Sequence, residues 1–401
     1  MSKFNSISIH FQTSLIVFFS LCSTCLTLFI YGISARNYDI QQLSSGILVL
    51  SISLYAVNLI DFGQATFAVQ EVVSKRRRIE DFYSLGVLKI VFSIGLSAVF
   101  GAVFYPKLQY LFYGSIITLS LLLIQQINIG LRVSGRTSSP GFLALIEKLS
   151  TSLILTLNFN FDWRLEFLEI YMFGVLTSLV VALKFSEIRL RRIDFSDIQS
   201  IFVKSSALGF SSLIGQAKLL DVNFLALMIG PVASAPYILV SRWASSVNLF
   251  SNAFSQSILP MFSESELSKR RFNEAKKASF WLILALVFSV IICLAAPLII
   301  EIILGDSNSE SAAILQVLSL ATIFTTLSQP LTVLIQTQSR SFFVTLSLCL
   351  GFVVQILIIF LLSNSNGASS AAIGYFCGQF VNFSLLLFFA FRIKNYFSNF
   401  Y

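Results

Sequence analysis

The sequence predicts an all-α membrane protein of about twelve transmembrane helices, arranged as two six-helix bundles around a central cleft. Three observations carry the prediction of membrane helices, and the two bundles and the cleft rest on the internal repeat and the polar spans described below. The chain is 56% hydrophobic and only 11% charged, whereas soluble domains carry about 25% charged residues. Apolar runs long enough to span a bilayer, which takes about 20 residues, recur along the whole chain. Finally, basic residues are dense in every second loop and sparse in the others.

The apolar runs place twelve spans, numbered in chain order, at 12–33, 44–67, 82–104, 108–130, 141–159, 166–185, 203–226, 235–259, 278–302, 312–336, 342–363 and 368–391. Spans 7 and 8 are unusually polar for membrane helices. Spans 3, 9 and 11 are the most apolar, and we expect them to face lipid.

The distribution of basic residues predicts the topology. Of the 27 lysines and arginines, 20 fall in segments on one side of the twelve spans, three fall on the other side, and four lie within spans. Short loops rich in Lys and Arg stay in the cytoplasm. We therefore expect a multi-pass protein with both termini cytoplasmic. The net charge of +8 is explained by this topology, without a nucleic-acid partner.

The two halves of the chain resemble each other. A basic loop follows span 2 at 75–78, and another follows span 8 at 269–277. Short loops with one Arg and several Ser or Thr follow spans 4 and 10. In both cases the two similar loops lie about 200 residues apart in the sequence. Six helices per half imply a repeat of the same orientation, related by an axis along the membrane normal. The predicted domains are residues 1–192 and residues 193–401.

Ionisable residues inside the spans are the candidate site residues, because charge in a membrane is costly and usually faces protein or water. A first group lies roughly 10–15 Å from the cytoplasmic ends of its helices, at 1.5 Å per residue. Its members are Asp61, Lys89, Glu147 and Lys148. Their charges sum to zero, so they either form structural ion pairs or line the inner mouth of a site.

A second group lies deeper, roughly 20–25 Å from the cytoplasmic face. Its members, Lys218, Asp221 and Arg242, sum to one positive charge. Lys218 and Asp221 are three residues apart and so share a helix face. A surplus cation suits an anionic substrate, because Lys and Arg make charge-assisted hydrogen bonds to phosphate oxygens. The alternative is structural pairing with Asp221.

Uncharged polar residues crowd the same two spans. Gln216 in span 7 and Asn248 in span 8 accompany many serines. Such density predicts a water-filled cleft whose hydroxyls and amides suit a sugar. The alternative is that the Ser hydroxyls only bond their own helix backbone.

Residues required for common enzyme chemistries are missing from the spans. The chain has one histidine, His10, near the cytoplasmic edge of span 1, so neither a Ser-His-Asp triad nor a His metal site can form inside the membrane. No Gly-x-x-x-x-Gly-Lys-Ser/Thr sequence is present for ATP binding. We therefore expect a protein that is not an enzyme and has no cofactor and no metal.

The stretch 56–65, Ala-Val-Asn-Leu-Ile-Asp-Phe-Gly-Gln-Ala, resembles the Leu-x-Asp-Phe-Gly signature of bacterial polysaccharide flippases. These are the O-antigen and exopolysaccharide flippases of the multidrug/oligosaccharidyl-lipid/polysaccharide exporter superfamily. Three further short motifs are similar to the family pattern: 35–39 before span 2, Gly230 with Pro236-Tyr237 before span 8, and 304–306 after span 9. One departure is Gln64, where the family often has Leu.

The resemblance implies a transporter in which helices 1, 2, 7 and 8 line a central cleft. Its substrate would be an undecaprenyl-pyrophosphate-linked oligosaccharide, flipped to the outer leaflet of the bacterial inner membrane for surface polysaccharide assembly. The internal repeat and the different depths of the two charged groups predict alternating access as the mechanism. The implied partners are this lipid-linked oligosaccharide, membrane lipids, a polysaccharide polymerase and a chain-length regulator.

Two other functions stay open at this point. A multidrug or metabolite exporter could have the same fold, although a cationic drug would favour a negative cavity over the net-positive second group. A membrane-embedded polysaccharide polymerase would need a sizeable outside loop or a catalytic acid and base, and the predicted loops contain neither.

Overall fold

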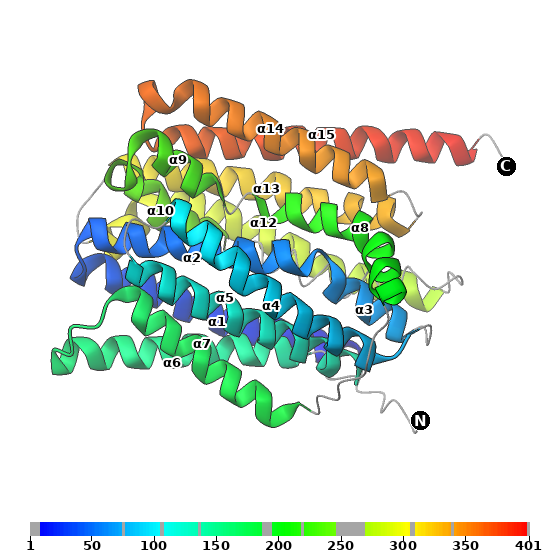
Figure 1. The fold of residues 1–401 in the computed structure, drawn as a ribbon. Coiled ribbons are helices and arrows are strands. Elements are labelled where there is room, and N and C mark those ends of the chain that lie inside the picture. Colours follow the sequence, from blue (N-terminus) through cyan, green and yellow to red (C-terminus); the bar gives the residue numbers. More distant parts are fainter. Residues whose placement is uncertain are drawn as a thin grey trace. The chain divides into compact units, whose positions relative to one another are not determined.

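The computed structural model is almost entirely helical over the residues that it describes, which are 9–73, 77–104, 108–134, 138–186, 195–217, 220–245, 269–304, 309–337 and 341–398 (Figure 1). Nine helices in these ranges are long and apolar enough to cross a membrane. The described parts of all twelve predicted spans are largely α-helical. The predicted all-α membrane fold is therefore confirmed.

The chain forms two compact units, Met1–Leu220 and Asp221–Tyr401. The helices of unit 1 are α1 (Ile9–Asn37), α2 (Ile40–Asp61), α3 (Gln64–Val73), α4 (Ile79–Phe104), α5 (Leu108–Val133), α6 (Ser139–Phe161), α7 (Phe167–Phe185) and α8 (Phe195–Ala217). Those of unit 2 are α9 (Asp221–Ile229), α10 (Pro231–Ser245), α12 (Lys269–Leu304), α13 (Ser309–Thr337), α14 (Ser341–Asn366) and α15 (Ser369–Ser398).

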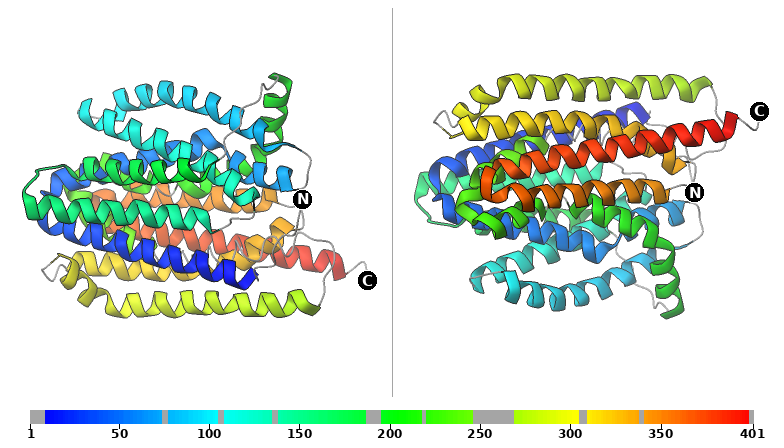
Figure 2. Two further views of the ribbon diagram at one scale, coloured as in Figure 1. Left: turned by 90° about the horizontal axis from the view of Figure 1, so that it is seen from below. Right: turned by 90° about the horizontal axis from the view of Figure 1, so that it is seen from above.

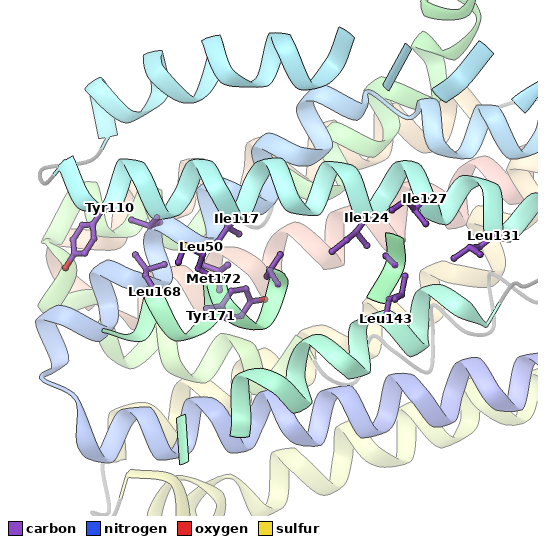
Figure 3. Packing of buried hydrophobic residues seen from close by; sticks show 13 residues of the cluster. Leu50, Tyr110, Ile117, Ile124, Ile127, Leu131, Leu143, Leu168, Tyr171 and Met172 are labelled. Atoms are coloured by element: carbon purple, nitrogen blue, oxygen red, sulfur yellow. The ribbon is translucent and has the colours of Figure 1, made fainter. Parts of the chain in front are cut away.

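The core of unit 1 lies between α2, α5, α6 and α7. Figure 3 shows its buried side chains, among them Leu50 of α2, Ile117 of α5, Leu143 of α6 and Leu168 of α7. Lipid is as apolar as these side chains, so close packing rather than the hydrophobic effect holds such helices together. On the far side of this core, α1 packs along α6 (Figure 2).

In unit 2, glycines bring the backbones of α14 and α15 close together. A Cβ on Gly351 of α14 would lie 2.6 Å from the backbone oxygen of Gly378 of α15, and the reverse distance is 2.7 Å. Only glycine allows backbones to approach this closely, which is the usual device of packed membrane helices. Accordingly, α14 and α15 lie side by side, as do α12 and α13 (Figure 2).

One predicted span is visibly interrupted: span 2 divides into α2 and α3 at Phe62 and Gly63. Span 7 begins as α8 and ends as α9, and residues 218 and 219 between them lie outside the described residues. The prediction of a continuous span 2 was wrong, because hydropathy does not register a break of two residues. The domain boundary predicted between residues 192 and 193 stays a prediction; α8 lies in unit 1, where it packs against α2 and α3.

Candidate functional site

The break between α2 and α3 positions the first candidate residues. Phe62 and Gly63 both take left-handed backbone conformations, with φ of 46° and 69°. Glycine adopts this conformation readily, whereas a bulky residue does so at a cost. The Phe62 N–H still donates to the oxygen of Asn58, and the Phe67 N–H donates to the oxygen of Gly63. The helix therefore stops and restarts within two residues, inside a predicted span.

The side chain of Asp61, the last residue of α2, bonds to the start of α3 and to α4. Its Oδ1 accepts a hydrogen bond from Lys89 Nζ of α4 at 2.7 Å, and its Oδ2 accepts one from the backbone N–H of Ala65 at 3.1 Å. The side chains of Asp61 and Lys89 are 6% and 8% exposed. The carboxylate thus satisfies one of the free N–H groups at the start of α3 and neutralises a buried lysine. These two predicted residues form an ion pair inside unit 1.

A second buried pair lies between α6 and α7. Glu147 Oε1 accepts hydrogen bonds from Lys148 Nζ at 2.6 Å and from the Tyr171 hydroxyl at 2.8 Å. Lys148 also contacts the Tyr171 hydroxyl and lies 4.3 Å from the centre of its ring. All four predicted charges of the first group are therefore paired, and Tyr171 also bonds to the second pair.

Unit 2 surrounds its buried carboxylate with hydrogen-bond donors. Asp221 is 5% exposed and begins α9. Its Oδ1 accepts from the Val222 N–H at 2.6 Å, and its Oδ2 accepts from the hydroxyl of Tyr237 in α10 and from Gln355 Nε2 in α14 at 3.2 Å. Asp221 thereby ties together three helices of this unit. A carboxylate held in this way is pre-organised at one point of unit 2.

The chain was compared with family models, curated proteins and solved structures, and only the solved structures match. No family model and no curated protein matches the sequence. Among solved structures, "Lipid II flippase MurJ, inward closed conformation" is similar with a TM-score of 0.70 and 14% identity, over 94% of this chain and 86% of that one. An outward-facing multidrug resistance MATE family transporter of the MOP superfamily gives 0.68 and 12%, over 96% and 95%. The eukaryotic MATE transporter AtDTX14 gives 0.61 and 15%, over 95% of each chain.

The chain has the fold of the MOP-superfamily transporters. This fold covers nearly the whole chain. A multi-pass membrane protein follows from the fold together with the nine membrane-length helices in the described ranges. The resemblance to polysaccharide flippases, which is a narrower statement, remains a prediction.

Within this MOP-transporter fold, the predicted outer site is described only in part. Asp221 is buried as described above, and Gln216 is half-buried near the end of α8. Lys218 and Asn248 lie outside the described residues. Arg242 lies on α10, but its side chain is outside what the structure describes. The net-positive group and the central cleft therefore stay predictions.

The serines of spans 7 and 8 mostly follow the alternative reading where their side chains are described. Ser205 and Ser206 of α8 donate to the oxygens of Phe202 and Val203, at 3.2 and 2.7 Å. Ser241 of α10 donates to the oxygen of Ile238 at 3.0 Å. These hydroxyls use their protons on their own helix. What they can offer a sugar is acceptor oxygens.

Sequence reasoning missed Tyr237 and Gln355, the two side chains that hold Asp221. Gln355 sits in span 11, which we expected to face lipid; one face of α14 is instead buried, and Gln355 on that face is 1% exposed. The opposite face does carry exposed apolar residues such as Val353 and Leu357. Gln355 is the only amide side chain of span 11, and this was the available signal, because a lone amide in lipid is costly.

Four buried amide atoms of unit 1 have no protein partner within the described residues. They are Oε1 of Gln64 and Gln125, Nε2 of Gln126 and Oδ1 of Asn128. Gln64 begins α3, directly after the break, and the other three lie on α5. Buried polar atoms are usually satisfied, so each such group calls for a role. Together they make the region around α3 and α5 polar.

Proposed function

We propose that this chain is a transporter that flips a lipid-linked oligosaccharide, carried on a polyprenyl pyrophosphate, from the cytoplasmic to the outer leaflet. The observation that carries the proposal is the MOP-transporter fold over nearly the whole chain, seen in a lipid II flippase among others. The sequence adds a surplus of one positive charge among Lys218, Asp221 and Arg242, which suits a pyrophosphate. The implied setting is a bacterial inner membrane, with both termini cytoplasmic.

In this proposal the substrate headgroup binds in the cleft while its lipid tail stays in the bilayer. Leaving the tail in lipid avoids exposing its apolar surface to water, at about 25 cal/mol per Å². Lys218 and Arg242 hold the pyrophosphate, and Asp221, Gln216 and Asn248 orient it and the first sugars. Asp61 and Lys89, being paired, keep the inner mouth neutral. The two six-helix halves, 1–192 and 193–401, rock about the site, and a polymerase and chain-length regulator act downstream.

The buried carboxylate of Asp221 supports this division of roles. Tyr237 and Gln355 donate hydrogen bonds to it, and both are neutral groups. These neutral donors of unit 2 position Asp221, which suits the orienting role that the proposal gives it.

Deleting the gene tests the proposal. We expect the lipid-linked oligosaccharide to accumulate on the inner leaflet and surface polysaccharide to disappear. Lys218→Gln and Arg242→Gln should reproduce this loss at normal protein level. Normal surface polysaccharide in a strain with no second flippase would overturn the function. Rescue of Lys218→Gln by Asp221→Asn would instead assign Lys218 to structural pairing.

A multidrug exporter of the same fold is the second candidate, because MATE transporters match nearly as well as the flippase does, with a TM-score of 0.68 against 0.70. It predicts a different phenotype. The deletion strain would keep its surface polysaccharide and become more sensitive to cationic drugs.

A further inference from the structure

Helix α8 follows the linker predicted between the two halves of the repeat, so by sequence it is the first helix of the second half. In the structure it packs instead against α2 and α3 of the first half (Figure 1). The two segments run antiparallel. Phe62 contacts Phe210, Phe67 shares an apolar cluster with Ile201, and Arg77 contacts Asp197. This contact of α8 with α2 and α3, called the seam below, runs from within predicted span 2 to its predicted cytoplasmic rim.

Phe62 forms the end of the seam that lies deeper in the predicted span. Its ring stacks on Phe202 of α8, with centroids 5.2 Å apart and an interplanar angle of 12°, and meets Phe210 edge-on at 5.3 Å. Gly209 lies between them: a Cβ there would come within 2.6 Å of the Phe62 ring and 2.7 Å of the Phe62 backbone oxygen. Only glycine at position 209 therefore allows α8 to pack this closely against Phe62, the residue at the helix break.

The rest of the seam continues to the rim. Phe67 and Ala68 of α3 share a buried apolar cluster with Ile201 of α8, which is fully buried. At the rim, Arg77 donates to the Ser200 hydroxyl at 3.0 Å and approaches Asp197 at 3.5 Å. Aromatic contacts, a small apolar cluster and one exposed ion pair are each modest, so the seam is of a kind that can open and close.

We propose that Phe62, Phe202, Gly209 and Phe210 form a latch that holds the cytoplasmic side of the transporter closed. Opening requires the Phe62 ring to leave its place between Phe202 and Phe210, which releases α8 from α2 and α3. The left-handed conformation of Phe62, φ 46°, is the strained element that the latch holds in place. This inference rests on the proposed transport function, and it assigns the cytoplasmic gate of that function to four residues.

Thiol labelling tests the latch without any transport measurement. In a chain with its five cysteines replaced, Ser205→Cys places a reporter on α8 between Phe202 and Gly209, at a position that is fully buried while the latch is closed. We expect a membrane-permeant maleimide to label it slowly. Phe62→Ala should raise the labelling rate at least tenfold, and Gly209→Ala should do the same by forcing the helices apart.

Gly215→Ala is the matched control, since a Cβ at this position of the same helix meets nothing within 4 Å. It should label like the parent. An unchanged rate in Phe62→Ala, or an equal rise in Gly215→Ala, would overturn the latch. Should Gly209→Ala fail to fold, the Phe62→Ala comparison still decides.

A cross-link supplies the functional readout. Cysteines replacing Phe62 and Phe202, bridged by a short bis-methanethiosulfonate, should stop transport, and reduction should restore it. Full transport by the cross-linked protein would refute the latch as a gate. Labelling that behaves as expected in a protein that moves no lipid-linked oligosaccharide would leave the latch standing and overturn the proposed substrate alone.

Discussion

The ion pair between Asp61 and Lys89 makes the sharpest stability prediction. The two side chains are 6% and 8% exposed and lie 2.7 Å apart. Removing one partner strands a buried charge, which costs about 3–5 kcal/mol. Lys89→Met should therefore lower the free energy of unfolding by about 3–5 kcal/mol, and Asp61→Asn should have a similar effect.

The double variant should be far less destabilised than the sum of the two. Asn at position 61 keeps an oxygen that can accept the Ala65 N–H, so the start of α3 stays capped. Replacing both charges by neutral groups of similar size is often close to neutral. We expect a coupling free energy of at least about 3 kcal/mol between the two sites.

Equilibrium unfolding in mixed micelles with increasing dodecyl sulfate measures all four proteins of this cycle. Additive single variants, or a Lys89→Met effect below about 1 kcal/mol, would mean that the pair is effectively in water. Either result would refute the assignment of Asp61 and Lys89 as a buried ion pair beside the break in span 2.

Further predictions concern topology, the outer loops and unit 2. Reporter fusions at Asn160 should read outside and those at Arg77 inside; an outside signal at Arg77 would overturn the count of helices. Burial raises the pKa of the Tyr38 hydroxyl from 10.0 to about 12, so its neutral form stabilises the fold below pH 10 and this contribution is lost as pH rises through 12. Tyr38→Phe should remove one step near pH 12 from the ultraviolet titration, and an unchanged titration would contradict this. Gly378→Ala should destabilise the protein by about 1–3 kcal/mol, because its Cβ would lie 2.7 Å from a backbone oxygen of α14, whereas Gly215→Ala should change stability little.

The helices were predictable because hydropathy reports directly on what a bilayer requires. The sequence also placed Asp61 and Lys89 at similar depth, which allowed their pairing to be considered. The break at Phe62 was not predictable, since it depends on a left-handed phenylalanine that only contacts with α8 explain. The motif Asp-Phe-Gly, used as a family signature, now has a physical reading: an acid that caps, a ring that docks and a glycine that turns.

The partners of Asp221 were missed for a related reason. Tyr237 lies in α10 and Gln355 in α14, each in a different helix from Asp221. In the sequence, 134 residues separate Asp221 from Gln355. A pattern within one helix cannot show that three helices converge on one carboxylate. Charge counting instead directed attention to Lys218, its neighbour in sequence.

Reconstitution tests the central claim most directly. The purified chain is placed in vesicles that contain a fluorescent, polyprenyl-pyrophosphate-linked oligosaccharide, and an impermeant reductant is added outside. The account predicts that label on the inner leaflet becomes reducible as the lipid is flipped, that Arg242→Gln slows this at least tenfold, and that a cationic dye does not cross. Export of the dye with no movement of the lipid-linked sugar would contradict the account and assign the chain to drug transport.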